Sequence, residues 1–309
     1  MHCGVTTWAG RERLRLPRRI RRSDMADRGV AVLGLGMMGS ALAGALLEAG
    51  LDVCVWNRTL EKAEPLRSAG ATVARDVADA VFDRDVVVVC LAEHDLTAPL
   101  LQDADLVGRC VVQLTAGNPA ESRRLDSWLS ARGAQFVEGQ IMVYPDTVGT
   151  EGSRIMYAGS RSALTQAEAV IAALGGAVDL GDEVGSVSGL AVAARTAYAA
   201  ASVATTLAVE IARSHGAPVD ATLAEIGPLH ELAVTGVRRS LEDQGPCDDG
   251  DVAVTIERLA AGTRSLVAVA ESVGLDSGVL QGGLGALERA IEAGHAGAPI
   301  GFVAPALHR

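Results

Sequence analysis

The sequence predicts an α/β protein, with a first part built around a parallel sheet and an all-helical second part that begins with a long interdomain helix. Two observations carry this prediction. From Gly29 to about residue 180, short runs rich in valine alternate with longer helical patterns, which is typical of parallel βαβ units. After Asp182 this strand pattern stops, and long stretches rich in alanine and leucine follow. A chain of 309 residues, of which 49% are apolar, is long enough for two such domains.

Seven strands are expected in the first part, at residues 30–33, 53–56, 72–74, 86–91, 110–114, 135–138 and 154–158. Several of these runs are apolar throughout instead of alternating, as expected for strands that are covered on both faces. Helices are expected between them at 39–49, 61–69, 119–132 and 162–174, and in the second part at 188–214, 218–241, 252–273 and 277–293. The helix expected at 188–214 is long enough to bridge domains or subunits.

These patterns divide the chain into residues 1–28, 29–180 and 181–309. The first segment carries eight arginines against three acidic residues and lacks the apolar run of a secretory signal. We expect this basic extension to be disordered. Three origins for it stay open: a basic arm, a weak organelle-targeting tail, or translated sequence upstream of a true start at Met25.

Composition excludes several classes of protein. A net charge of −11 with only 3% aromatic residues argues against a nucleic-acid-binding protein, which would need a basic face and stacking rings. The five cysteines are an odd number without a Cys-x-x-Cys pair, so neither a disulfide framework nor a metal site is expected, and a cytoplasmic location fits best. No uninterrupted run of about 18 apolar residues predicts a membrane span.

A glycine-rich turn follows the first predicted strand directly and opens the first predicted helix. Its sequence is Gly34-Leu35-Gly36-Met37-Met38-Gly39. In this setting Gly34 permits the tight turn, Gly36 lets the backbone approach a pyrophosphate, and Gly39 permits close packing of helix on strand. The free N–H groups at the helix start face the anion. The motif therefore predicts a Rossmann dinucleotide-binding domain over residues 29–180, with all six residues of the turn at the cofactor.

The end of the second predicted strand indicates which dinucleotide binds. A site specific for NAD usually has an acidic residue there to hold the ribose 2′-hydroxyl, whereas this chain has Asn57, Arg58 and Thr59. Arg58 can lie over the adenine and donate to a 2′-phosphate, and Lys62 is within reach of the same anion. Asn57 and Thr59 can add hydrogen bonds. These four residues predict NADPH as the cofactor.

The loops after the fourth and fifth predicted strands are expected to complete the cofactor site. Leu91 ends the fourth predicted strand, Ala92 follows it, and Thr115 follows the fifth strand, at the carboxyl edge of the sheet where cofactor loops lie. His94 lies in the first of these loops, and we expect it to be an exposed histidine with at most a weak role toward the cofactor.

Beyond residue 28 the sequence resembles the imine reductases, relatives of the β-hydroxyacid and 6-phosphogluconate dehydrogenases. The resemblance rests on the glycine-rich turn and on segments 56–59, 62–63, 114–119, 138–145 and 293–295. It implies an NADP-dependent oxidoreductase that delivers hydride from NADPH to the C=N carbon of a small-molecule imine or iminium. It also implies a domain-swapped homodimer, in which residues 181–309 form a helical dimerisation and substrate domain.

The sequence departs from this family at the position of the proton donor. In the family a glycine turn, here Gly181 and Gly185, is followed six residues later by Asp or Tyr in many imine reductases and by Lys in the hydroxyacid dehydrogenases. This chain has Ala191. Two tyrosines are candidate catalytic substitutes. Tyr198 shares a helical stripe with position 191, roughly 10 Å farther along the helix, and Tyr144 lies in the segment that the family places near the nicotinamide. A solvated or hydrogen-bonded helix face for Tyr198 and a packing role for Tyr144 stay open as alternatives.

The missing donor also suggests a class of substrate. A preformed iminium cation needs no acid from the enzyme, because its nitrogen already carries the positive charge. We therefore expect cyclic iminium ions or readily protonated imines as substrates, with the pocket excluding water. Two alternatives stay open: an NADPH-dependent reductase of C=O or C=C bonds in the β-hydroxyacid dehydrogenase superfamily, and a non-catalytic NADPH-binding protein.

Overall fold

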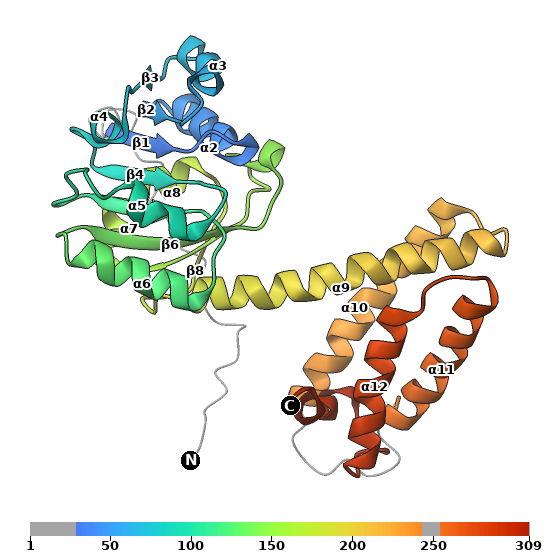
Figure 1. Cartoon of the computed structure of the whole chain (residues 1–309). Coiled ribbons are helices and arrows are strands. Elements are labelled where there is room, and N and C mark those ends of the chain that lie inside the picture. Colours follow the sequence, from blue (N-terminus) through green and yellow to red (C-terminus); the bar gives the residue numbers. More distant parts are fainter. Residues whose placement is uncertain (1–28, 243–253, 309) are drawn as a thin grey trace. The chain divides into compact units, whose positions relative to one another are not determined.

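The computed structural model describes residues 29–242 and 254–308, which form two compact units (Figure 1). The first unit ends at Ala194 and the second begins at Arg195. The basic extension, residues 1–28, for which disorder is expected, lies outside the described residues. The domain boundary drawn from the sequence near Leu180 stays a prediction.

An eight-stranded sheet forms the centre of the first unit. Its strands are β1 (Gly29–Leu33), β2 (Asp52–Trp56), β3 (Thr72–Val73), β4 (Val86–Val89), β5 (Cys110–Gln113), β6 (Gln135–Ile141), β7 (Ile155–Gly159) and β8 (Ala177–Asp179). Their order is β3-β2-β1-β4-β5-β6-β7-β8, and all neighbours pair in parallel except β6 and β7. The order β3-β2-β1-β4-β5-β6 is that of a Rossmann sheet, so the predicted fold class is confirmed.

Helices cover both faces of this sheet (Figure 1). They are α2 (Met37–Glu48), η2 (Leu60–Ala63), α3 (Glu64–Ser68), α4 (Val77–Val81), η3 (His94–Leu96), α5 (Thr97–Leu100), α6 (Pro119–Ser130), η4 (Pro145–Thr147), α7 (Arg161–Gln166) and α8 (Glu168–Ala173). Val30 and Val32 of β1 pack into one core with α2, and Ala31 and Leu33 pack into a second core with α6. Both faces of the strand are therefore buried, which is why its sequence is apolar throughout.

Some short elements differ from the sequence prediction. The sequence does not predict strand β8 or helices α4 and α5, and the helix expected at 162–174 is divided into α7 and α8 at Ala167. Each of these elements has three to six residues. That is too short to complete two turns of helix or a clear strand alternation, so periodicity gives no signal for them.

The second unit is helical, as predicted. It holds the later part of α9 (Ser186–Ser214), which begins in the first unit, together with α10 (Val219–Glu242), α11 (Ile256–Ser272), α12 (Gly278–Glu292) and η5 (Ile300–Leu307). The start of the helix expected at 252–273 lies partly outside the described residues. The buried cluster of this unit is small and consists of Ile256, Ala260, Leu287 and Ala290.

Helix α9 is the one described helix that is long and apolar enough to cross a membrane, by length and composition alone. Its best window has a mean hydropathy of 1.2, and 17% of that window is buried. A helix that packs against another protein subunit has the same composition, so this single helix does not assign the protein to a membrane.

Candidate cofactor site and active site

The three glycines of the predicted cofactor turn lie in three different environments. Gly34 has a positive φ of 97°, and a Cβ there would overlap the carbonyl oxygen of Cys90. A Cβ on Gly39 would overlap the carbonyl oxygen of Gly34. A Cβ on Gly36, in contrast, would meet no atom within 4 Å. The turn is thus closely packed at its two ends and open at Gly36, where the motif places the pyrophosphate.

The N-terminus of α2 is free to receive an anion. Gly36 is its N-cap residue and makes no side-chain cap, and the first turn contains no acidic residue. The first N–H groups of a helix lack intrahelical partners and lie at the positive end of its dipole. Leu35 is buried in the core and Met38 packs against it, whereas Met37 is 86% exposed. The backbone of this turn and the open side of Gly36 fit the pyrophosphate of a dinucleotide.

Asn57 connects the end of β2 to the glycine-rich turn. Its side-chain oxygen accepts a hydrogen bond from the Leu35 N–H at 2.9 Å, and its amide group donates to the Thr59 carbonyl at 2.9 Å. The side chain therefore orders the loop. Arg58, Thr59 and Lys62 are all exposed, and within the described residues neither cation forms a salt bridge. Two uncommitted cations at this strand end suit a 2′-phosphate.

Thr115 connects the loops after β4 and β5. Its hydroxyl accepts a hydrogen bond from the Leu91 N–H at 2.8 Å, and the residue is 2% exposed. The side chain of Thr115 is therefore committed to the protein, whereas Ala92 lies at the surface. The fold brings the loops after β4 and β5 to the same edge of the sheet, as expected.

His94 is buried, so the expectation of an exposed loop histidine is wrong. It is 5% exposed, and its ring lies against Gly117, where a Cβ would overlap it. Burial lowers the pKa of His94, and the nearby Glu121 carboxylate opposes this shift in part. Its Nε2 has no hydrogen-bond partner in the described structure. The residue supports the turn after β5 by packing, and sequence reasoning missed this because Gly117 lies far away along the chain.

Position 191, where the resemblance places the proton donor, is inside the protein. Ala191 is 1% exposed and packs in an apolar cluster with Met156, Ala158 and Val187, against which Met142 also packs. Sequence reasoning missed one polar neighbour of α9: the carboxyl group of Glu138, which accepts hydrogen bonds from the start of that helix.

The two candidate tyrosines lie in different units. Tyr144 precedes η4 in the first unit and is 72% exposed, and Tyr198 belongs to the part of α9 in the second unit and is 65% exposed. Their assignment as proton donors stays a prediction.

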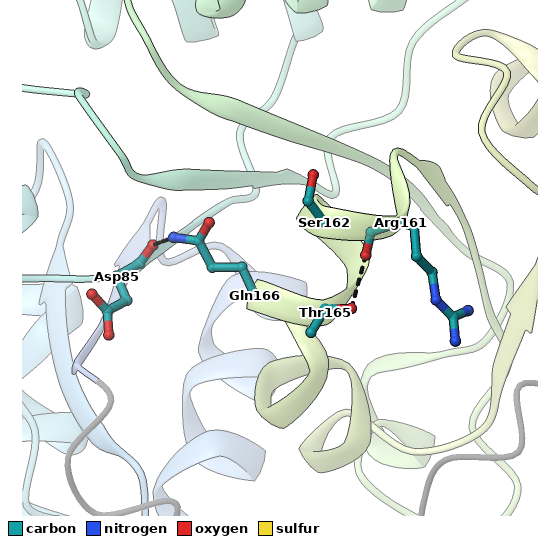
Figure 2. A pocket seen from close by; sticks show the side chains of 5 residues that line it. All are labelled: Asp85, Arg161, Ser162, Thr165 and Gln166. Carbon is teal, nitrogen blue, oxygen red and sulfur yellow. Dashed lines mark hydrogen bonds between the residues drawn. The ribbon is translucent and has the colours of Figure 1, made fainter.

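A broad hollow of about 710 Å³ lies elsewhere, at the amino ends of the strands (Figure 2). It is lined by Asp85, Arg161, Ser162, Thr165 and Gln166. The Gln166 amide donates to the Asp85 carbonyl at 3.1 Å and the Gly108 carbonyl at 2.9 Å. These bonds tie the strand starts together. The Arg161 side chain points away from Asp85 and Gln166 (Figure 2). Ligands of Rossmann sheets bind at the opposite, carboxyl edge.

Comparison with known proteins agrees with this geometry. Residues 29–182 match the NAD-binding domain of 6-phosphogluconate dehydrogenase. An NADPH-dependent reductive aminase from Aspergillus oryzae is 31% identical over 277 residues, which are 87% of this chain and 93% of that protein.

Solved structures extend the likeness to the whole fold. An imine reductase from Myxococcus stipitatus in complex with NADP+ has a TM-score of 0.85 and 31% sequence identity, covering 91% of this chain and 100% of its own. A reductive aminase from Aspergillus terreus in complex with NADPH and ethyl levulinate has a TM-score of 0.82 and 28% sequence identity, covering 92% of this chain and 100% of its own. The glycine turn, the cationic end of β2 and this similarity along the chain together show that the protein belongs to the imine reductase family.

Proposed function

We propose that this protein is an NADPH-dependent reductase that transfers hydride to the C=N carbon of an imine or iminium. The observation that carries the proposal is the composition of the segment after β2. It contains Arg58 and Lys62, and it lacks the carboxylate that an NAD-specific enzyme has at this strand end. The glycine turn is open at Gly36. When bound, NADPH supplies the hydride.

The residues of this chain bind and orient the cofactor. The N–H groups at the start of α2 hold the pyrophosphate, and Arg58 and Lys62 hold the 2′-phosphate. The hydrogen bonds of Asn57 and Thr115 keep the surrounding loops in place. The protein's contribution to the rate is then positioning and exclusion of water more than acid catalysis.

The substrates that fit best are iminium cations and readily protonated imines. Ala191 lies among methionine and alanine side chains and has no proton to donate. The resemblance places the proton donor at this position, so this chain lacks that acid. A cationic substrate does not need that acid. Tyr144 and Tyr198 are the two side chains that could take the role for neutral imines.

Oxidation of NADPH against a panel of substrates tests this function. We expect turnover of an N-methylated dihydroisoquinolinium, slower turnover of the neutral dihydroisoquinoline, and none of a ketone without amine. Reduction of ketones or activated C=C bonds in preference to both would instead support the alternative reductase. Tight NADPH binding without turnover of any substrate would support a non-catalytic NADPH-binding protein.

Three variants and one control test the possible proton donors. In Ala191→Asp, burial raises the pKa of the introduced carboxyl, so a protonated acid is available near neutral pH and turnover of the neutral imine should rise. Ala193→Asp, on the exposed side of the same helix, is the matched control and should give no gain. Unchanged neutral-imine rates in Tyr144→Phe and Tyr198→Phe would remove both tyrosines from the mechanism.

We further propose that the protein is a homodimer in the cytoplasm. The large apolar surface of the second unit supports the dimer, because a soluble monomer rarely exposes so many apolar side chains together. The resemblance adds that the subunits exchange domains and form the substrate pocket together.

A further inference from the structure

A buried carboxyl group lies in the middle of β6. Glu138 is 1% exposed and is flanked in the sheet by Gln113 of β5 and Ala158 of β7. Within the described residues it forms no salt bridge with an arginine or lysine. A carboxyl group is costly to bury unless hydrogen bonds replace its water. The hydrogen-bond partners of Glu138 therefore explain how its carboxyl group can be buried.

Those partners are two N–H groups at the start of α9. One oxygen of Glu138 accepts from the Gly185 N–H at 2.7 Å, and the other accepts from the Ser188 N–H at 3.0 Å. N–H groups of a first helical turn have no partner within the helix, and the positive end of the helix dipole favours a negative group. Gly185 has a positive φ of 98°, a conformation that glycine adopts without strain. The carboxylate oxygens of Glu138 and the two N–H groups therefore satisfy each other's need for a hydrogen-bond partner.

The two chain segments joined by Glu138 lead into one apolar cluster. Met142 follows Glu138 by four residues, and Ala191 follows Ser188 by about one helical turn. Both pack in the cluster that also contains Met156. The two hydrogen bonds of Glu138 therefore join β6 to the start of α9, immediately before the residues of that cluster.

We propose that Glu138 is a positioning residue for imine reduction, which sets the register of α9 on β6 and thereby the places of Met142 and Ala191. In this proposal Glu138 acts through the helix, by way of its hydrogen bonds to Gly185 and Ser188. This inference rests on the proposed function, since the place of position 191 affects turnover only if the chain reduces imines.

The test is Glu138→Gln in the full-length protein. Glutamine keeps the volume of the side chain, but its NH2 group would face one of the two N–H groups, so one hydrogen bond is lost. We expect amide exchange in the segment 183–191 to become at least about tenfold faster, because its opening costs less free energy. We expect the KM for the imine to rise about tenfold through misplacement of the pocket, with the NADPH Kd unchanged within about twofold.

Two further variants complete the test. Glu138→Asp keeps the charge but is one methylene shorter, and should change exchange and KM in the same direction by less; it carries the test if Glu138→Gln does not fold. Ser160→Ala is the control, because it removes the hydroxyl that caps α7 through the Ala163 N–H at 3.2 Å. It should lower Tm while leaving the KM and the exchange of segment 183–191 unchanged.

The outcomes are separable. Unchanged exchange of segment 183–191 in both Glu138 variants overturns the proposal, and so does faster exchange with an unchanged KM. If the wild-type protein binds NADPH but reduces no imine or iminium, the proposed function fails and the catalytic part of this inference fails with it. Exchange of segment 183–191 would then decide separately whether Glu138 holds α9.

Discussion

The glycines of the cofactor turn differ in what a Cβ would meet, so alanine substitutions at Gly36 and Gly39 should have different effects. We predict that Gly36→Ala leaves the free energy of unfolding within about 0.5 kcal/mol of wild type, because a Cβ there meets no atom and φ is −72°. The same methyl group would stand where the glycine motif predicts that the pyrophosphate approaches, so the Kd for NADPH should rise at least about tenfold. Gly39→Ala should instead lower the free energy of unfolding by about 1–3 kcal/mol, because its Cβ overlaps the Gly34 carbonyl oxygen. Urea denaturation and fluorescence titration with NADPH measure the two effects.

Gly44 supplies the control for this comparison. It lies inside α2, and a Cβ there also meets no atom within 4 Å. Gly44→Ala should therefore stabilise the protein by about 0.5–1 kcal/mol through helix propensity and leave NADPH binding unchanged. Equal losses of NADPH affinity in Gly36→Ala and Gly44→Ala would contradict the assignment of Gly36 to the pyrophosphate.

The buried His94 makes stability depend on pH. Burial lowers its pKa in the folded state below the usual 6.5, so between these two values the unfolded chain binds a proton that the folded chain does not. This contribution to stability is present above pH 6.5 and is lost as pH falls through that window. The free energy of unfolding should fall with acidity by at most about 1.4 kcal/mol per pH unit from this one group. His94→Asn should reduce that slope, as measured by urea denaturation from pH 7.5 to 5.

Removal of an exposed histidine is the matched comparison. His215 lies at the end of α9 and is exposed. His215→Asn should keep the slope of the wild-type protein. A wild-type slope in His94→Asn as well would show that other groups control the acid side of the stability curve.

At the scale of elements, the sequence predicted what depends on local pattern. Each residue of β1 from Val30 to Leu33 is buried on one face or the other, so the run is apolar throughout and can be read directly as a covered strand. The glycine turn could be placed for the same reason, because its three glycines serve a strand–turn–helix unit that is contiguous in the chain. The short strand β8 could not, because three half-buried residues have no period.

The parts of the site that the sequence missed depend on contacts between distant segments. His94 was expected at the surface because it follows a strand in a loop, but it is covered by Gly117 from the next loop. Glu138 meets N–H groups 47 and 50 residues away. Such pairs are set by the order of strands in the sheet, and a single sequence does not display them.

At the scale of the whole molecule, the exposed apolar side chains of the second unit support the proposed dimer. Helix α10 alone exposes six large apolar side chains: Leu223, Leu229, Leu232, Val234, Val237 and Leu241. The buried cluster of the same unit is small. Water contact with this much apolar surface is unfavourable, and a second copy of the chain would remove it.

The proposed homodimer can be tested by substitution on α10. Light scattering after size exclusion should give a mass of twice 31.7 kDa for the wild-type protein. Leu229→Glu with Leu232→Glu places charges at two exposed positions of the second unit, so the variant should shift toward the monomer and its Tm should fall as the protein is diluted. Phe82→Glu, at a 78% exposed position of the first unit, is the matched control and should stay dimeric. The residues proposed to bind the cofactor lie in the first unit, so the α10 variant should still bind NADPH. Loss of imine turnover with retained NADPH binding would indicate that the substrate pocket depends on the dimer. A monomeric wild-type protein with full turnover would contradict the proposed dimer.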